Sequence, residues 1–268
     1  MHPVLFEFGS VTIYTYGALV AAGFLAALVY ARRQAPRAGL DPHNIWNLGI
    51  YGILVALLVA KVWLVLSAWD FFTTNPSLIF SVVTFQSGGT FYGGVLGGIV
   101  WVVLYCYFKK MPLLGVLDLL APAIALGHGI GRLGCFAAGC CYGKPTVLPW
   151  GVTFTSPVAV QIAGTPLHVS LHPTQLYEAG AEFVNFLLLL GLGTRPRLRG
   201  QMIGAYFILY GIERGAIEFV RGDPGRTLMF HDTVSLMQFA SAGLILGGGL
   251  LWWRGVRRGA PLPDESAG

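Results

Sequence analysis

Long apolar stretches separated by short polar segments run through the whole chain. A helix needs about 20 mostly apolar residues to cross a bilayer. Stretches of that kind lie at about 11–30, 46–67, 91–108, 113–133, 174–193, 201–221 and 233–253. The pattern predicts an all-α integral membrane protein with about seven transmembrane helices. No polar linker divides the stretches, so we expect residues 1–268 to form a single polytopic membrane domain.

Composition supports a membrane protein. Hydrophobic residues make up 55% of the 268 positions and charged residues 11%, whereas soluble domains carry roughly 25% charged residues. A soluble fold of this size could not cover its surface with so little charge. The 37 glycines suit helices that pack closely in lipid. The formal net charge of +5 would also suit a nucleic-acid-binding protein, but the placement of the basic residues argues against a nucleic-acid partner.

Basic residues cluster after alternate apolar stretches, which predicts the orientation of the chain. Loops rich in Lys and Arg remain in the cytoplasm, so we expect the N-terminus outside and the C-terminus inside. No Lys or Arg precedes the first stretch, which argues against a cleavable signal peptide. The segment at about 134–172 then lies outside, where we expect a small periplasmic cap. The cytoplasmic clusters are Arg32, Arg33 and Arg37; Lys109 and Lys110; Arg195, Arg197 and Arg199; and Arg254, Arg257 and Arg258.

The other basic residues lie inside predicted helices or on the outer side. A charge within a span costs at least about 2.5 kcal/mol, so it normally faces a cavity or a partner. Ion pairs with Glu178, Glu213 or Glu218 are one interpretation. An anion site is the other, because the guanidinium fork of arginine can hold a phosphate by two hydrogen bonds. The residues concerned are Lys61, Arg132, Lys144, Arg214, Arg221 and Arg226.

Polar motifs interrupt the apolar pattern at three places. Residues 128–136 read His-Gly-Ile-Gly-Arg-Leu-Gly-Cys-Phe, and small glycines around Arg132 let a backbone or a lipid headgroup come close. Residues 172–178 read His-Pro-Thr-Gln-Leu-Tyr-Glu, with a proline suited to the first turn of a helix. In the third motif Tyr210, Arg214, Glu218 and Arg221 line one helical stripe, which in a membrane protein faces the bundle interior.

In this order, the motifs resemble the bacterial prolipoprotein diacylglyceryl transferases over nearly the whole chain. Tyr16-Gly17, the Gly-Gly stretch at 88–94, Gly131-Arg132-Leu133-Gly134, residues 172–178, the stripe at 210–221, and Gln238 with Ser241 carry the resemblance. It implies a multi-pass enzyme of the bacterial inner membrane with its active site toward the periplasm. Such an enzyme moves the diacylglyceryl group of phosphatidylglycerol to the lipobox cysteine of a prolipoprotein signal peptide. A thioether forms and glycerol phosphate leaves.

The resemblance also implies site residues. Arg132 is similar to the family's phosphatidylglycerol-binding arginine and Arg214 to an essential arginine. Tyr92 stands where the family usually has a histidine proposed as base, and phenols are weak bases at neutral pH. His172, His128 or direct activation by arginine could replace it. We expect Arg132, Arg214, Tyr92 and His172 to be catalytic, with no cofactor and no metal. Substrate binding is expected from Arg132 and from Tyr16, Gly131, Gly134, Gln175, Tyr177, Glu178, Tyr210, Glu218 and Arg221.

Three cysteines, Cys135, Cys140 and Cys141, fall together at the predicted outer face. A disulfide would suit an oxidising periplasm, although the two adjacent cysteines rarely pair with each other. A metal site would need a fourth ligand, such as His128 or His168. Small buried thiols are the third interpretation.

Other functions predict other features. A catalytically altered paralogue would bind phospholipid or lipoprotein without transfer, and Tyr92 and Cys140 motivate that alternative. A small-solute transporter would predict inverted repeats and ionisable pairs near mid-bilayer, whereas the polar residues here cluster toward the outer side. A thiol-redox protein would depend on the three clustered cysteines.

Overall fold

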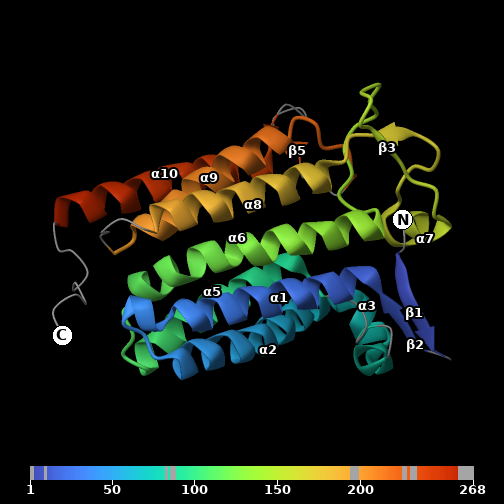
Figure 1. The fold of residues 1–268 in the computed structure, drawn as a ribbon. Helices are drawn as coiled ribbons and strands as arrows, with labels where there is room; N and C mark the ends of the chain where they lie inside the picture. Colours follow the sequence, from blue (N-terminus) through green and yellow to red (C-terminus); the bar gives the residue numbers. More distant parts are fainter. Residues whose placement is uncertain are drawn as a thin grey trace. The chain divides into compact units, whose positions relative to one another are not determined.

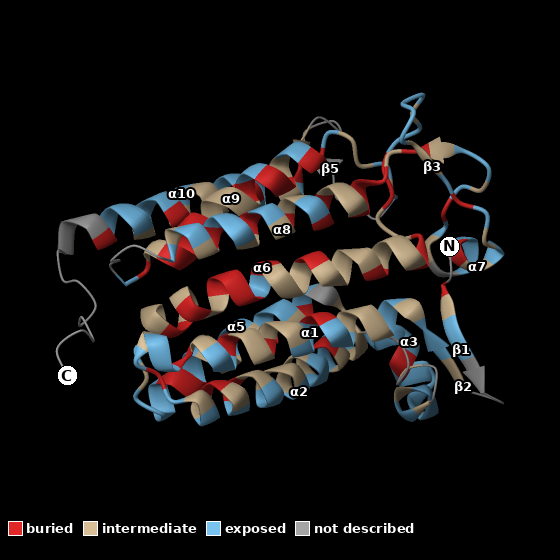
Figure 2. Cartoon of the chain, viewed as in Figure 1, coloured by how far each residue is buried: buried red, intermediate tan, exposed pale blue. Residues whose placement is uncertain are grey.

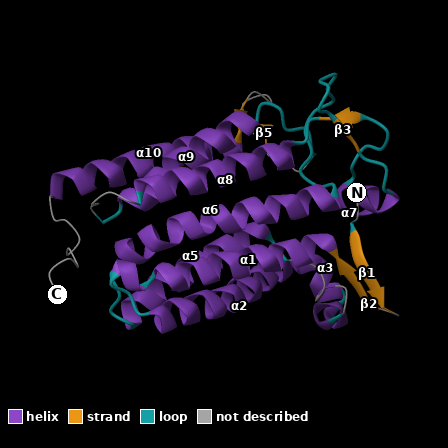
Figure 3. Cartoon of the chain, viewed as in Figure 1, coloured by secondary structure: helices purple, strands orange, loops and turns teal. Residues whose placement is uncertain are grey.

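The computed structural model describes residues 3–8, 11–81, 84, 89–193, 199–224, 228–229 and 234–258. Helices dominate this part of the chain, with short antiparallel strand pairs beside them (Figures 1 and 3). The chain forms two compact units. The first joins Met1–Tyr30 with Leu117–Gly268, and the second is Ala31–Val116. Four residues named for the sequence pattern, Gly88, Arg195, Arg197 and Arg226, lie outside the described residues.

A helix occupies each predicted apolar stretch. Four of the described helices are long and apolar enough to cross a membrane: Thr15–Gln34, Pro42–Ser67, Leu113–Ala138 and Leu236–Gly255. Helix α8 (Thr174–Leu192) is less apolar, because Glu178, Glu182 and Asn185 lie within it. The helices are α1 (Thr15–Gln34), α2 (Pro42–Ser67), α5 (Phe91–Phe108), α6 (Leu113–Ala138), α8 (Thr174–Leu192), α9 (Gln201–Ile217) and α10 (Leu236–Arg258).

Two helix starts differ from the sequence prediction. The stretch at 11–30 opens with strand β2 (Val11–Tyr14), which pairs with β1 (Val4–Phe8). β-Branched residues favour this extended start, so α1 begins only at Thr15. In the same way β6 (Val234–Ser235) pairs with β5 (Leu228–Met229) before α10 begins.

The connection after α2 also contains α3 (Trp69–Thr74) and the 3-10 helix η2 (Pro76–Phe80).

The segment between α6 and α8, where we expect the cap, contains short elements of its own. Strand β3 (Val152–Thr153) pairs with β4 (Ser170–Leu171), and α7 (Pro157–Ala163) lies between them in sequence. Phe154, which is fully buried, packs with Tyr142 and Leu171 in a small core. The cap is therefore held by apolar packing of its own.

In the first unit a buried core joins α6, α8 and α9. Ala121 and Ala125 of α6 pack with Leu189 of α8 and Ile203 of α9, and Figure 2 shows buried residues recurring along these helices. The carboxylate of Asp118 accepts hydrogen bonds from the backbone N–H groups at the start of α9, from Gly200 at 2.6 Å and Ile203 at 3.0 Å. That capping satisfies donors that a helix start would otherwise leave unpaired.

In the second unit small residues let α2 and α5 approach closely. A Cβ atom on Gly93 would lie 2.7 Å from Cβ of Trp63, and one on Gly97 would lie 2.7 Å from Cβ of Val59. Trp101 of α5 donates from its indole nitrogen to the carbonyl oxygen of Leu48 at 2.9 Å. Backbone proximity through small residues is the usual basis of helix packing in lipid.

The contact between α9 and α10 depends on paired glycines, which gives a stability prediction. A Cβ on Gly248 would lie 2.5 Å from the carbonyl oxygen of Gly204, whereas one on Gly249 would meet nothing within 4 Å. Gly248→Val should therefore overpack this contact and cost about 1–3 kcal/mol of stability. Thermal unfolding of the purified protein in detergent, followed by tryptophan fluorescence, should show a Tm several degrees lower. Gly249→Val is the matched control, and equal Tm values for both variants would contradict the prediction.

Candidate active site

Arg132, on the last turns of α6, is the centre of a chain of polar contacts. Its Nε forms an ion pair with the carboxylate of Glu178 on α8 and donates to Nε2 of His128 at 3.0 Å. The other ring nitrogen, Nδ1, donates to Oε1 of Glu182 at 2.6 Å. Nε2 accepts here, so Nδ1 carries the hydrogen. His128 thus holds the guanidinium of Arg132 in place, and its acceptor nitrogen is already engaged.

The terminal nitrogens of Arg132 are in a different position from its Nε. No described residue is hydrogen-bonded to them. Gly131 beside it has nothing within 4 Å of the place where a Cβ would lie. The protein therefore fixes the guanidinium of Arg132 through its Nε, and the two terminal nitrogens remain available to bind an anion.

A second buried arginine lies on α9. Nη1 of Arg214 donates to Oε2 of Glu218 at 2.7 Å, and both side chains are less than one-tenth exposed. Tyr210, one turn earlier, stacks on Tyr206 and packs against the ring of His128. The predicted polar stripe of α9 is therefore joined to the contacts around Arg132.

Two further acidic residues extend this network, and of these the sequence motifs did not include Glu182. Glu182 accepts from the hydroxyl of Tyr206 at 3.1 Å, and Glu213 accepts from the amide of Asn185 at 2.7 Å. One oxygen of each carboxylate has no hydrogen-bond partner among the described atoms. Spacing could have revealed Glu182, because Glu178, Glu182 and Asn185 recur at i, i+4 and i+7 on one helical face.

The start of α8 holds the loop that follows α6. Thr174 Oγ1 donates to the carbonyl oxygen of Cys141 at 2.6 Å, and Gln175 Nε2 donates to that of Cys140 at 2.6 Å. Both side chains of α8 are fully buried. Next to them, the carbonyl of His172 accepts from the backbone N–H of Gly143 at 2.9 Å. The motif at 172–178 therefore fixes the loop as well as starting the helix.

The ring of His172 is oriented by aromatic neighbours. Its Nδ1 lies 3.3 Å from the hydroxyl oxygen of Tyr177, which also accepts from the indole of Trp150 at 2.8 Å. Among the described residues, none is hydrogen-bonded to its Nε2. His172 therefore differs from His128, whose two nitrogens are both engaged.

Arg221 lies beyond the end of α9 and is paired with Asp223. Its Nε donates to one carboxylate oxygen at 2.5 Å and its Nη2 to the other at 3.1 Å. Burial alone would lower the pKa of Arg221, but the hydrogen bond with Asp223 raises it, so the cation is maintained. The structure therefore pairs three arginines, at 132, 214 and 221, with carboxylates. The ion-pair interpretation named the partners of the first two, Glu178 and Glu218, but not Asp223.

The contacts described above do not include three of the predicted residues, Gly134, Tyr16 and Tyr92. Gly134 lets α6 approach α1, because a Cβ there would lie 3.2 Å from the carbonyl oxygen of Tyr16. Tyr16 itself is exposed. Tyr92 belongs to the second unit, where it is an exposed residue in the first turn of α5.

Comparison with known proteins gives a consistent assignment. The family described as "Prolipoprotein diacylglyceryl transferase" matches residues 3–254. Proteins named phosphatidylglycerol–prolipoprotein diacylglyceryl transferase are similar along almost their whole length. The one from Clostridium tetani is 38% identical, over 92% of this chain and 95% of its own. The one from Pseudoalteromonas translucida is 34% identical, over 94% and 92%. A Clostridium perfringens relative, whose name ends in "2", is 32% identical, over 94% of each chain. The chain belongs to the prolipoprotein diacylglyceryl transferase family.

Proposed function

We propose that this enzyme transfers the diacylglyceryl group of phosphatidylglycerol to the lipobox cysteine of prolipoproteins. The relatives named above carry phosphatidylglycerol and prolipoprotein in their names. The observation that carries the proposal in this chain is the buried arginine network, in which Arg132 and Arg214 each contact a carboxylate. Membrane proteins seldom bury such charges without a functional reason.

The reaction requires a nucleophile and a stabilised leaving group. The thiolate of the lipobox cysteine attacks the glycerol carbon that is bonded to the phosphate oxygen. The C–O bond breaks, a thioether forms, and glycerol phosphate leaves with the electron pair. Negative charge grows on the phosphate as the bond breaks, so preorganised cations lower the barrier. Arg132 and Arg214 are proposed for this role.

The thiol proton needs an acceptor, and the candidates are His172 and Tyr92. His172 is the better supported, because it is paired with the loop at 140–143 and one of its ring nitrogens is not engaged by a described residue. His128 is proposed as a positioning residue for Arg132 rather than as the base, because both of its nitrogens are already hydrogen-bonded.

The other predicted residues are proposed to shape the two substrate sites. Gly131 leaves room for a lipid headgroup, and Gly134 lets α6 pack against α1 beside it. Glu178 and Glu218 hold the arginines. The remaining members of the proposed binding set are Tyr16, Gln175, Tyr177, Tyr210 and Arg221.

We also propose that the chain is a single seven-span domain of the inner membrane, with its N-terminus outside, its C-terminus in the cytoplasm and its active site toward the periplasm. The positive-inside rule and the helix in each apolar stretch support this topology. Protein fused to green fluorescent protein at the C-terminus should fluoresce, whereas fusion of alkaline phosphatase there should be inactive. An active phosphatase fusion would contradict this orientation.

Removing either central arginine should abolish transfer. Purified protein in detergent, given phosphatidylglycerol and a lipobox peptide, should form a thioether peptide detected by mass spectrometry. Arg132→Ala and Arg214→Ala should each lose at least 100-fold in rate, because each removes a cation that stabilises the leaving group. Arg254→Ala, which changes an exposed arginine of α10, should retain the wild-type rate.

A folding defect is separated from a catalytic one by a conservative variant. Arg132→Lys keeps the positive charge but loses the planar fork, so we expect at least a tenfold loss of rate with an almost unchanged Tm. Wild-type activity in Arg132→Ala would exclude the assigned role. Lipid binding without any thioether from the wild-type protein would instead favour a binding paralogue.

The two candidates for proton acceptor predict different variants. His172→Gln should lower the rate at least tenfold, because it removes the imidazole but keeps a polar side chain of similar size. Tyr92→Phe, which removes only the hydroxyl, should lower it less than threefold. The same transfer assay measures both, and the reverse order of effects would assign proton transfer to Tyr92.

A further inference from the structure

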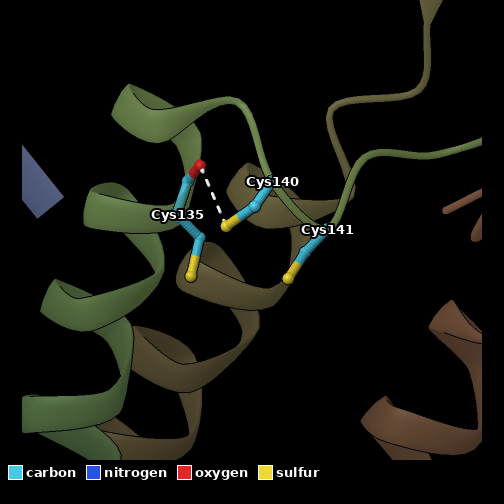
Figure 4. Close-up of side chains that lie close together, drawn as sticks. All are labelled: Cys135, Cys140 and Cys141. Carbon is cyan, nitrogen blue, oxygen red and sulfur yellow. Dashed lines mark hydrogen bonds between the residues drawn. The ribbon is translucent and has the colours of Figure 1, made fainter. Parts of the chain in front are cut away.

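Three thiols converge where α6 ends. Cys135 lies on the last turn of α6, and Cys140 and Cys141 follow directly after it. Their sulfur atoms all lie within 4.8 Å of one another, and Figure 4 shows the side chains gathered between α6 and the loop. Among the described residues no histidine, aspartate or glutamate joins this group.

The backbone takes an unfavourable conformation to bring the thiols together. Cys141 has a φ of 60°, in the left-handed region that non-glycine residues rarely adopt. Gly139, at φ 82°, makes the turn away from α6. The buried Thr174 and Gln175 hold the carbonyl groups of Cys141 and Cys140. α8 thus fixes the loop, and in this arrangement the sulfurs of Cys140 and Cys141 lie within 4.8 Å of that of Cys135.

We propose that Cys135, Cys140 and Cys141 form a three-thiolate site for Zn²⁺. Zinc binds thiolate at about 2.3 Å, so three sulfurs around one tetrahedral ion lie about 3.8 Å apart. The observed spacing, within 4.8 Å, reaches that geometry through small side-chain movements. This site revises the expectation that the protein needs no metal.

A disulfide would explain less of the arrangement of the three cysteines than a zinc ion does. It would join two of the sulfurs and leave the third without a role, and adjacent cysteines pair rarely. A zinc ion uses all three sulfurs and explains why α8 holds both loop carbonyl groups. Three protein ligands with one exchangeable position are typical of catalytic zinc rather than structural zinc.

The fourth position suits the thiol of the lipobox cysteine, and this step rests on the proposed function. Zinc coordination would deprotonate that thiol, and its proton would pass to the acceptor proposed above, His172. The zinc-bound sulfur then attacks the glycerol carbon, the C–O bond to phosphate breaks, and the thioether leaves the metal. No oxidant or reductant is required.

Metal binding is tested on the full chain in detergent. After treatment with a chelator and loading with Co²⁺, the wild-type protein should bind one equivalent and show sulfur-to-cobalt charge-transfer absorption near 300–350 nm and tetrahedral bands near 600–750 nm. Cys135→Ser, Cys140→Ser and Cys141→Ser should each lose most of both signals. Cys106→Ser is the matched control, because it changes a buried cysteine of the other unit, and its spectrum should match wild type.

A second measurement on wild-type protein removes the possibility that the serine variants merely fail to fold. Bound Zn²⁺ should protect the three clustered thiols from alkylation at least tenfold relative to the chelator-treated protein, as shown by peptide mass spectrometry. A wild-type spectrum no different from that of the triple serine variant would overturn the proposal. So would a disulfide between any two of the three cysteines in protein purified without reductant.

The substrate thiol is tested on the cobalt form. A lipobox peptide should increase the charge-transfer absorption by about one third, because a fourth sulfur is added to three, whereas the same peptide with serine for cysteine should not. An intact cobalt spectrum that ignores the cysteine peptide would overturn the substrate-ligand assignment. Failure of the proposed function is distinct, because it would show as absent thioether product with the cobalt spectrum unchanged.

Discussion

The pairing of charge inside an apolar helix bundle is the constraint on which the rest of this structure depends. Arg132 contacts Glu178, and Arg214 contacts Glu218, with both pairs almost withdrawn from solvent. Removing one member of such a pair leaves a buried charge and commonly costs about 3–5 kcal/mol. The Arg132–Glu178 pair joins α6 to α8, and the hydrogen bonds of Tyr206 to Glu182 and of Asn185 to Glu213 join α8 to α9. These three helices must therefore keep their relative register. The loop after α6 and the glycine contact between α9 and α10 belong to the same unit as that core.

The same pairing makes the arginines suitable for chemistry. Each guanidinium is held by one carboxylate on the protein side, so an incoming phosphate meets a cation that is already oriented. Preorganised charge of this kind lowers a barrier without a cost of reorganisation during the reaction. The carboxylates thus contribute to stability and to the proposed function through one set of contacts.

Much of this architecture could be predicted from sequence, because apolar length and polar interruptions report directly on helices in lipid. The helix in each stretch followed from that logic, and the ion pairs of Arg132 and Arg214 were one of the two interpretations that the sequence left open. The strand β2 did not, because the apolar Val11 and Ile13 continue the apolar stretch of the helix that they precede. The convergence of Cys135 with Cys140 and Cys141 did not either, since it depends on a left-handed residue and on hydrogen bonds from α8.

The most direct test of the central claim is the balance between the two products. Wild-type protein would be given phosphatidylglycerol and a lipobox peptide, and both glycerol phosphate and thioether peptide would be quantified over time. The account predicts that one glycerol phosphate appears for every thioether formed, at equal rates. Glycerol phosphate released without thioether, or lipid bound with neither product formed, would contradict it.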